Sequence, residues 1–193
     1  MTRSRSLDEL DWPLRSARLT LRPGRSADAE EVWPWYRLPE VQEYTTTLSP
    51  TLADHRTWWD GGLETRIVGL QEGRIVAAGK VARQDAWSQA EMREQAAGRQ
   101  AEIGWVLDPA VQGRGLGTEF AAALRDIAFD GLGVRRLEAS CFAENHASRR
   151  VMEKIGLRLE GIFREESLHR SGRWLDGASY ALLASEPRPP LSG

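Results

Sequence analysis

The chain has 193 residues, of which 41% are hydrophobic and 28% are charged, a composition typical of one soluble globular domain. Its formal net charge is −2, so no overall attraction draws it to nucleic acid or to an anionic membrane. No apolar run approaches the ~18–20 residues that span a bilayer. No apolar segment follows the charged N-terminal residues either, so we expect neither a membrane span nor a signal peptide.

The N-terminal half of the chain predicts one strand, three helices and a hairpin. Residues 16–23 alternate in polarity and end at Pro23, as a strand would. Helix-forming segments with capping residues, prolines or glycines at their ends follow at 27–37, 39–44 and 51–62. In the first of them, Pro34 should bend or end the helix, because a proline in a helix interior removes a hydrogen bond. Two β-rich runs, 64–70 and 74–82, flank a short turn and predict a β-hairpin.

The C-terminal half predicts alternating strands and helices. Residues 83–100 are polar and poor in β-branched residues, which indicates either a mobile loop or a short exposed helix. Strands are then expected at 101–107, 134–144, 158–170 and 173–184, and helices at 115–133 and 145–156. This order predicts an α/β fold on one mixed sheet. We expect residues 16–184 to form a single domain, residues 1–15 an N-terminal arm, and residues 185–193 a flexible, proline-rich C-terminal tail.

Cysteine and histidine are too sparse for a disulfide or a metal cluster. The single cysteine, Cys141, excludes an internal disulfide and fits a reducing cytoplasm. The histidines, His55, His146 and His169, are dispersed without metal-ligand spacing. We therefore expect a cytoplasmic protein without a bound metal.

Residues 112–118, QGRGLGT, lie between a predicted strand and a predicted helix. The first turn of a helix leaves backbone amides without partners, and together with the helix dipole they attract anions, phosphate above all. Glycines let the backbone turn sharply and let a phosphate approach without meeting a Cβ atom. Arg114 adds a cationic donor. The segment therefore predicts a pyrophosphate-binding site.

Four interpretations of this segment compete. A P-loop needs GxxxxGK[ST], and no lysine is present. A dinucleotide fingerprint needs GxGxxG, which Gly113 and Gly115 begin, but Thr118 stands at the third glycine and too little chain remains for two βαβ halves. A tight turn without a ligand is the third possibility. The fourth is an acyl-CoA cradle with the pattern [QR]-x-x-G-x-[GA], which Gln112, Gly115 and Gly117 match at every place.

From about residue 16 to residue 184 the chain resembles the GNAT N-acetyltransferases, and among them the RimJ/RimL-like branch. The most specific motif is IGWVLDPAVQGRGLGTEFAAALRDIAF, which contains the cradle. The second, NHASRRVMEKIGL, is similar to the branch's N-x-x-S-x-x-V-x-E-K-x-G-F helix, with Leu157 in place of phenylalanine. The third, SGRWLDGASYALLASE, is close to the branch's G-x-W-x-D…Y-x-L-L ending.

The resemblance implies the GNAT acyl-CoA N-acyltransferase fold, a central mixed sheet flanked by helices. Its fourth and fifth strands, here 101–107 and 134–141, would lie parallel and splay apart at their C-terminal ends to hold the pantetheine arm of acetyl-CoA. The implied cofactor-binding positions lie on the splayed strand, in the cradle and on the helix after the fifth strand: Val106, Leu107, Gln112, Gly113, Arg114, Gly115, Leu116, Gly117, Thr118, Asn145 and Ser148.

The resemblance also implies a reaction, the transfer of an acetyl group from acetyl-CoA to a primary amine by direct attack in a ternary complex. Asn145 and Ser148 are three residues apart, so a helix places them on one face, where Ser148 could protonate the leaving thiolate; both could also simply cap the helix. Met152 replaces the tyrosine that many GNAT enzymes use as the acid. Glu102 is the candidate general base, and its alternatives are an exposed or ion-paired carboxylate, or a water chain in place of a base.

The acceptor is expected to be a protein N-terminus or a small-molecule amine, bound between the helices of residues 27–61 and the last hairpin. Aromatic side chains crowd that region and could line a pocket, although core packing is their simpler role: Trp33, Trp35, Tyr36, Trp58 and Trp59. A non-catalytic acyl-CoA-binding or sensing module is the alternative function. No basic stripe predicts nucleic-acid binding, and a homodimer is implied only by the family.

Overall fold

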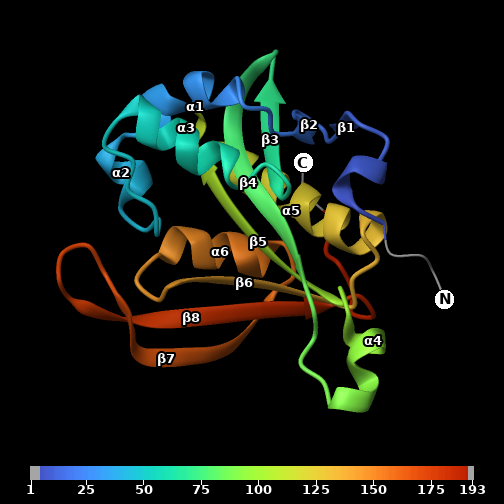
Figure 1. Cartoon of the computed structure of the whole chain (residues 1–193). Coiled ribbons are helices and arrows are strands. Elements are labelled where there is room, and N and C mark those ends of the chain that lie inside the picture. Colours follow the sequence, from blue (N-terminus) through green and yellow to red (C-terminus); the bar gives the residue numbers. More distant parts are fainter. Residues whose placement is uncertain (1–4, 191–193) are drawn as a thin grey trace.

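The computed structural model describes residues 5–190, which form one eight-stranded sheet with helices on both faces (Figure 1). The strands are β1 (Leu14–Arg15), β2 (Thr20–Pro23), β3 (Arg66–Gln71), β4 (Arg74–Gln84), β5 (Gln100–Leu107), β6 (Arg136–Phe142), β7 (Arg158–Leu168) and β8 (Trp174–Leu183). They lie in the order β1-β2-β3-β4-β5-β6-β8-β7. Only β5 and β6 pair in parallel, so the mixed sheet that the sequence predicts is confirmed.

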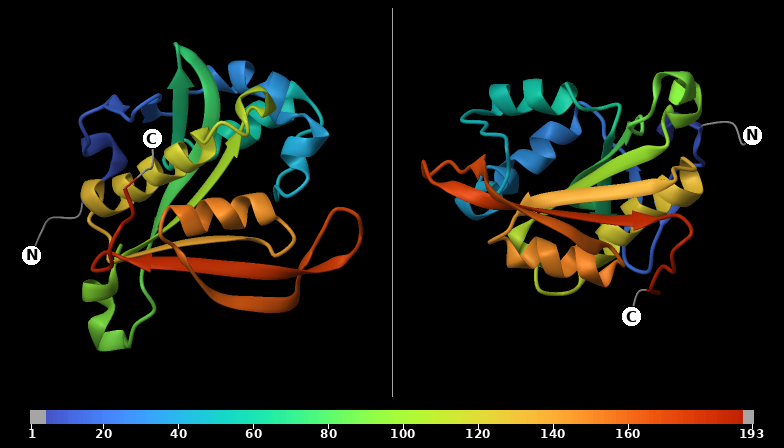
Figure 2. Two further views of the ribbon diagram at one scale, coloured as in Figure 1. Left: turned by 180° about the vertical axis from the view of Figure 1, so that it is seen from behind. Right: turned by 90° about the horizontal axis from the view of Figure 1, so that it is seen from below.

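The helices are α1 (Asp28–Tyr36), α2 (Pro39–Gln42), α3 (Leu52–Asp60), α4 (Arg93–Ala96), α5 (Leu116–Asp126) and α6 (His146–Lys154). Figure 2 shows α1 and α3 on one side of the sheet and α5 and α6 on the other. None of these described helices combines the length and the apolar character that crossing a bilayer requires.

Close packing of α5 on β4 depends on Gly79. A Cβ atom there would lie 2.9 Å from side-chain carbons of both Phe120 and Leu124, which is closer than carbon atoms approach without strain. Both side chains are fully buried. The missing side chain of Gly79 therefore lets α5 lie directly against β4, the strand that pairs with β5. This contact helps to set where α5 begins.

Several predicted boundaries differ from the structure. The helix expected at 115–133 is α-helical only to Asp126 and continues as a π-helical turn from Ile127 to Gly131. Residues 16–23 do not form one strand, because Ser16 and Leu19 close a turn through a 2.9 Å backbone hydrogen bond and separate β1 from β2. The helix α1 runs through Pro34 to Tyr36, so the proline does not end it. Only two helical residues follow Pro34, and the loss of one hydrogen bond so close to the C-terminus is tolerated.

Two other predictions are confirmed. Thr51 caps α3 by accepting a hydrogen bond from the amide of Asp54, and residues 64–82 contain the β3–β4 hairpin. In residues 83–100, β4 continues to Gln84 and the short helix α4 lies exposed, as one of the two predicted alternatives.

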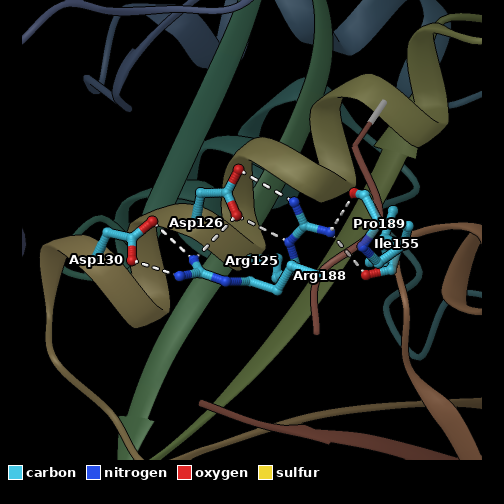
Figure 3. Close-up of polar contacts among 6 residues, drawn as sticks. All are labelled: Arg125, Asp126, Asp130, Ile155, Arg188 and Pro189. Atoms are coloured by element: carbon cyan, nitrogen blue, oxygen red, sulfur yellow. Dashed lines mark hydrogen bonds and ion pairs between the residues drawn. The ribbon is translucent and has the colours of Figure 1, made fainter. Parts of the chain in front are cut away.

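Both ends of the described chain contact the domain. Leu7, in the expected N-terminal arm, is buried in the main core. In the expected tail, Arg188 forms ion pairs with Asp130 and Asp126, and the carbonyl of Pro189 accepts a hydrogen bond from Arg125 (Figure 3). Residues 1–4 of the arm and 191–193 of the tail lie outside the described residues.

A second, smaller core lies between α1, α3 and the sheet, and it encloses His55. The imidazole is fully buried, neither ring nitrogen has a hydrogen-bond partner in the described chain, and its ring centroid lies 4.9 Å from that of Tyr36. Burial, reinforced by the charge of Arg66, lowers the pKa of His55 to about 4. The neutral imidazole therefore acts as an aromatic filler of this core.

Replacing His55 by phenylalanine should remove a pH dependence of stability. The folded state keeps His55 neutral down to about pH 4, whereas the unfolded chain takes up a proton near pH 6.5. The unfolded state thus binds more protons in this window, and as the pH falls through it the wild type should lose up to about 3 kcal/mol that His55→Phe retains.

Thermal unfolding of both proteins between pH 7 and pH 4 measures this difference. His146→Phe, at an exposed position, is the control and should follow the wild type. Parallel curves for the wild type and His55→Phe would contradict the assignment.

Candidate active site

The strands β5 and β6 separate after a short parallel stretch. They pair over only the first three residues of each, and Glu102 opposite Glu138 is the last pair. Beyond it β5 continues to Leu107 and β6 to Phe142, and Figure 1 shows the two strands diverging. From Ile103 onward the edge of β5 that faces β6 has no partner strand. This is the splayed parallel pair that the resemblance to the GNAT enzymes implies.

A cavity of about 370 Å³ opens in the gap between the two strands. Its walls come from both sides of the sheet: the segment after α2 and the end of α3 on one side, and the start of α6 on the other. The predicted site residues that line it are Glu102, Val106, Asn145 and Ser148. Of the aromatic residues that the sequence offered as pocket lining, Tyr36 and Trp58 also line it, whereas Trp33, Trp35 and Trp59 do not. Arg66 and Lys80, which had no predicted role, line it as well.

Glu102 sits at the closed end of the fork and is ion-paired. Lys80 Nζ lies 2.9 Å from its Oε1, and both side chains remain partly exposed. Lys80 lies on the neighbouring strand β4, opposite Gly104, so the pair is diagonal. Of the alternatives for Glu102, the structure therefore shows an ion-paired carboxylate, and it places that carboxylate on the cavity wall. Sequence analysis missed Lys80, although a lysine in the apolar run 74–82 was a usable signal.

Asn145 caps α6 and faces the cavity as well. Its Oδ1 accepts a hydrogen bond from the backbone amide of Ser148 at 3.0 Å. The cap occupies only the carbonyl oxygen, so the Nδ2 group stays available as a donor. The Ser148 hydroxyl takes no part in the cap, because the donor to Asn145 is the backbone amide of Ser148. Capping and a role toward a bound molecule are therefore compatible for both residues.

Cys141, at the cavity wall, is a protonated thiol. Burial raises its pKa, and this outweighs a hydrogen bond with Ser148 and the charge of Arg149, which lower it. A thiol that stays protonated at neutral pH is a poor nucleophile. Met152, which stands in place of the tyrosine that many GNAT enzymes use as the acid, also lines the cavity and has no hydroxyl. On this face of α6 the hydroxyl is therefore that of Ser148.

The cradle presents a run of free backbone donors. Gly113 and Gly115 adopt φ values of +74° and +79°, a region that other residues rarely enter. In the described chain, the amides of residues 113–118 find no acceptor, and α5 has no side-chain cap. Free amides at a helix N-terminus form an anion-binding site. The Leu116 side chain is buried in the core, so this residue can contribute only its amide.

A buried carboxylate anchors the cradle to the N-terminal strands. Glu119, in the first turn of α5, accepts hydrogen bonds from Ser16 Oγ and from the backbone amide and Nε of Arg18 at 2.6–2.7 Å. Burial raises the pKa of Glu119, but the hydrogen bonds from Ser16 and Arg18 prevail and hold it below its ordinary value. Arg18 Nη1 also donates to the carbonyl of Arg114 at 2.8 Å. Sequence analysis missed Arg18, because 96 residues separate it from Arg114 and no motif marks it.

The cradle lies just beyond the cavity, where β5 ends. A Cβ atom on Gly117 would lie 3.5 Å from the methyl groups of Leu107, so the last residue of β5 touches the first turn of α5. Gln112 Nε2 donates to the carbonyl of Leu107 at 3.4 Å. The two halves of the predicted cofactor site, the open strand edge and the cradle, are therefore continuous.

Comparisons with known proteins agree with this geometry. The uncharacterized N-acetyltransferase YnaD of Bacillus subtilis is 40% identical over 85 residues. These residues are 44% of this chain and 49% of that protein, so the chain matches about half its length. A crystal structure of a GNAT-family acetyltransferase from Bacillus anthracis is 28% identical, with a TM-score of 0.76 over 90% of this chain and 99% of that one.

A second solved structure shares the fold. The ribosomal L7/L12 α-N-protein acetyltransferase RimL in complex with coenzyme A is 18% identical, with a TM-score of 0.70 over 87% of this chain and 95% of that one. The chain also matches the acetyltransferase (GNAT) domain family over residues 18–158. Because this match covers most of the chain, the protein belongs to the GNAT acetyltransferase domain family.

Proposed function

We propose that the protein is an acetyl-CoA-dependent N-acetyltransferase of the RimJ/RimL-like branch, which moves an acetyl group to a primary amine by direct attack in a ternary complex. The observation that carries the proposal is the run of free amides at residues 113–118, continuous with the open edge of β5. The free amides suit a diphosphate, and the open edge of β5 suits an extended arm that contains amide groups. The branch is supported by the α6 and C-terminal motifs and by the fold shared with RimL.

Acetyl-CoA would be held by backbone groups more than by side chains. The amides from Gln112 to Thr118 would bind its diphosphate, with Arg114 adding a cationic donor. The free edge of β5 would pair with the pantetheine arm as an added strand does, through the backbone of Leu107. Val106 would contribute only its side chain. Backbone groups of adjacent strand residues point to opposite edges, and the amide of Asp108, two residues after Val106, bonds to Val76 of β4, so the backbone of Val106 faces β4 as well. The cavity would then receive the acetyl group from one side of the sheet and the acceptor amine from the other.

The acid–base chemistry is assigned to Glu102 and Ser148. Glu102 would accept a proton from the acceptor ammonium, directly or through water. The nitrogen lone pair then forms a bond to the thioester carbonyl carbon, the nitrogen releases its second proton to solvent, and the C–S bond breaks. Ser148 would give its hydroxyl proton to the departing sulfur and regain one from solvent, while Asn145 Nδ2 donates to the bound arm. Holding both reactants in one cavity supplies much of the rate enhancement.

A screen of amines and N-terminal peptides with acetyl-CoA, read out as released thiol, tests the proposal. We expect turnover of at least one acceptor class. Tight binding of acetyl-CoA with no turnover of any amine would instead support the acyl-CoA-binding module.

Substituting Gly115 by aspartate should abolish acetyl-CoA binding, because it places a carboxylate where the diphosphate would lie. We expect the Kd, measured by calorimetric titration, to rise at least about 100-fold. Gly133→Asp is the matched control: it has a φ of +68° and open space around it, so it adds the same strain and charge at the far end of the helix. Equal affinities for the two variants would rule out the cradle.

Replacing Glu102 by glutamine should slow turnover about 10- to 100-fold near pH 6–7 if Glu102 is the base. The deficit should shrink as the pH rises, because more of the acceptor amine is then already neutral. Glu138→Gln is the control, since Glu138 lies opposite Glu102 but pairs with Arg136 and does not line the cavity. A pH–rate profile identical to the wild type would remove Glu102 from the mechanism.

A further inference from the structure

Arg66 lines the active-site cavity without an acidic partner. It begins β3, is 8% exposed, and forms no ion pair with any described residue. Its guanidinium lies 4.3 Å from the ring centroids of both Trp58 and Trp59. It donates only to their carbonyl groups, through Nε to Trp59 at 3.3 Å and through Nη2 to Trp58 at 3.4 Å.

Three other shielded arginines of the described chain have carboxylates beside them, although the half-buried Arg83 donates only to backbone carbonyls. Arg125 contacts Asp126, Arg22 contacts Asp28, and Arg136 contacts Glu138. A buried charge without such a partner is costly. Burial accordingly lowers the pKa of Arg66 to about 10, although Tyr36 and the carboxylates of Glu64 and Asp60, neither of which forms an ion pair with Arg66, oppose this shift. Arg66 therefore remains a cation at neutral pH.

The edge of the guanidinium is free for a ligand. The two indoles pack on Arg66 and leave its in-plane N–H groups as the available donors. Nη1 has no protein acceptor, and it is not among the sealed polar atoms of the described core. A planar carboxylate is the group that such an edge binds best, with two parallel hydrogen bonds.

The charges of the cavity wall favour the same ligand. Arg66 and Lys80 contribute two positive charges, and Glu102 contributes one negative charge that Lys80 already neutralises. The excess positive charge thus belongs to Arg66. An acceptor in its reactive form, with a neutral amine and an ionised carboxylate, carries the complementary negative charge.

We propose that the acceptor is a small amine that carries a carboxylate, such as an amino acid, and that Arg66 binds this carboxylate while the amine faces the fork. The proposal rests on the N-acetyltransferase function proposed above and specifies its substrate class. A protein N-terminus, with no carboxylate at a fixed short distance from its amine, leaves Arg66 unpaired.

The strand register indicates how far apart the two groups lie. Arg66 is opposite Lys80, and Lys80 is opposite Gly104. The backbone of Arg66 is therefore two strand spacings, about 10 Å, from that of β5. A series of amino acids with different numbers of carbons between the amine and the carboxylate will show which length spans the distance from the Arg66 guanidinium to the reacting amine.

The experiment compares each acceptor with its own carboxamide, which keeps the amine and removes the charge. Glycine, β-alanine, 4-aminobutyrate, 5-aminovalerate and a set of α-amino acids are assayed with acetyl-CoA beside their amides. For the best chain length, we expect the wild type to prefer the carboxylate about 10- to 100-fold in kcat/KM, mainly through KM.

Arg66→Met should abolish this preference by raising KM for the carboxylate while leaving the amide unchanged, and Arg66→Lys should keep part of it. Arg125→Met is the matched control. Arg125 is also a buried arginine that donates to a backbone carbonyl, that of Ile155, but it does not line the cavity (Figure 3). This variant should lose thermal stability and keep the preference.

The outcomes separate the two proposals. If no amine, amide or peptide is acetylated, the N-acetyltransferase function is wrong and this inference falls with it. If amides or peptides are acetylated as well as carboxylates or better, the function stands and the carboxylate acceptor is wrong. If carboxylates are preferred but Arg66→Met and Arg66→Lys keep the wild-type preference, the assignment to Arg66 is wrong. The wild-type comparison needs no variant and remains decisive if Arg66→Met fails to fold.

Discussion

The short parallel pairing of β5 with β6 is the constraint on which the rest of the site depends. Backbone hydrogen bonds join the strands only as far as Glu102 and Glu138, and the divergence beyond leaves one edge of β5 without a partner strand. If β5 and β6 stayed paired along their whole length, the backbone groups of that edge would be hydrogen-bonded and buried. Here it borders a cavity that joins the two faces of the sheet. The fork therefore creates both a strand-like binding edge and a passage between the two sides.

The helix after β5 extends this edge into an anion site. Because Leu107 touches the first turn of α5, the free amides of the cradle continue directly from the open strand. The buried Glu119 and the Arg18 that spans Glu119 and the Arg114 carbonyl hold the turn in place without using those amides. Positioning and binding are thus divided: side chains from the N-terminal segment fix the loop, and its backbone remains free for a ligand.

The opposite side of the fork has a different chemistry. The rings of Trp58 and Trp59, both on α3, pack on Arg66, and Tyr36 and the threonines after α2 line the same cavity. Under the proposed function, the cofactor side would be made mostly of backbone and the acceptor side of side chains. Variation on the acceptor side can change the substrate without disturbing the fork.

Local sequence determined the elements and the cradle. Polarity periods, capping residues such as Thr51 and Asn145, and the spacing of glycines act over one helical turn or one hairpin, so they can be read without knowing the fold. These signals failed where a local turn competed, as at Ser16 and Leu19, or where a helix tolerated a proline near its end. The helix cap at Asn145 and its place beside Ser148 were predictable for the same local reason.

Tertiary structure alone decided which side chains share the cavity. Arg66, Lys80 and Glu102 come from three strands, and only the sheet register brings them to one wall. Arg18 reaches the cradle across 96 residues. Whether a carboxylate is ion-paired, and whether an arginine lacks a partner, depends on neighbours distant in the chain. Charge interactions and burial depend on distance in space, so the spacing of residues in the sequence predicts them only for neighbours a few positions apart.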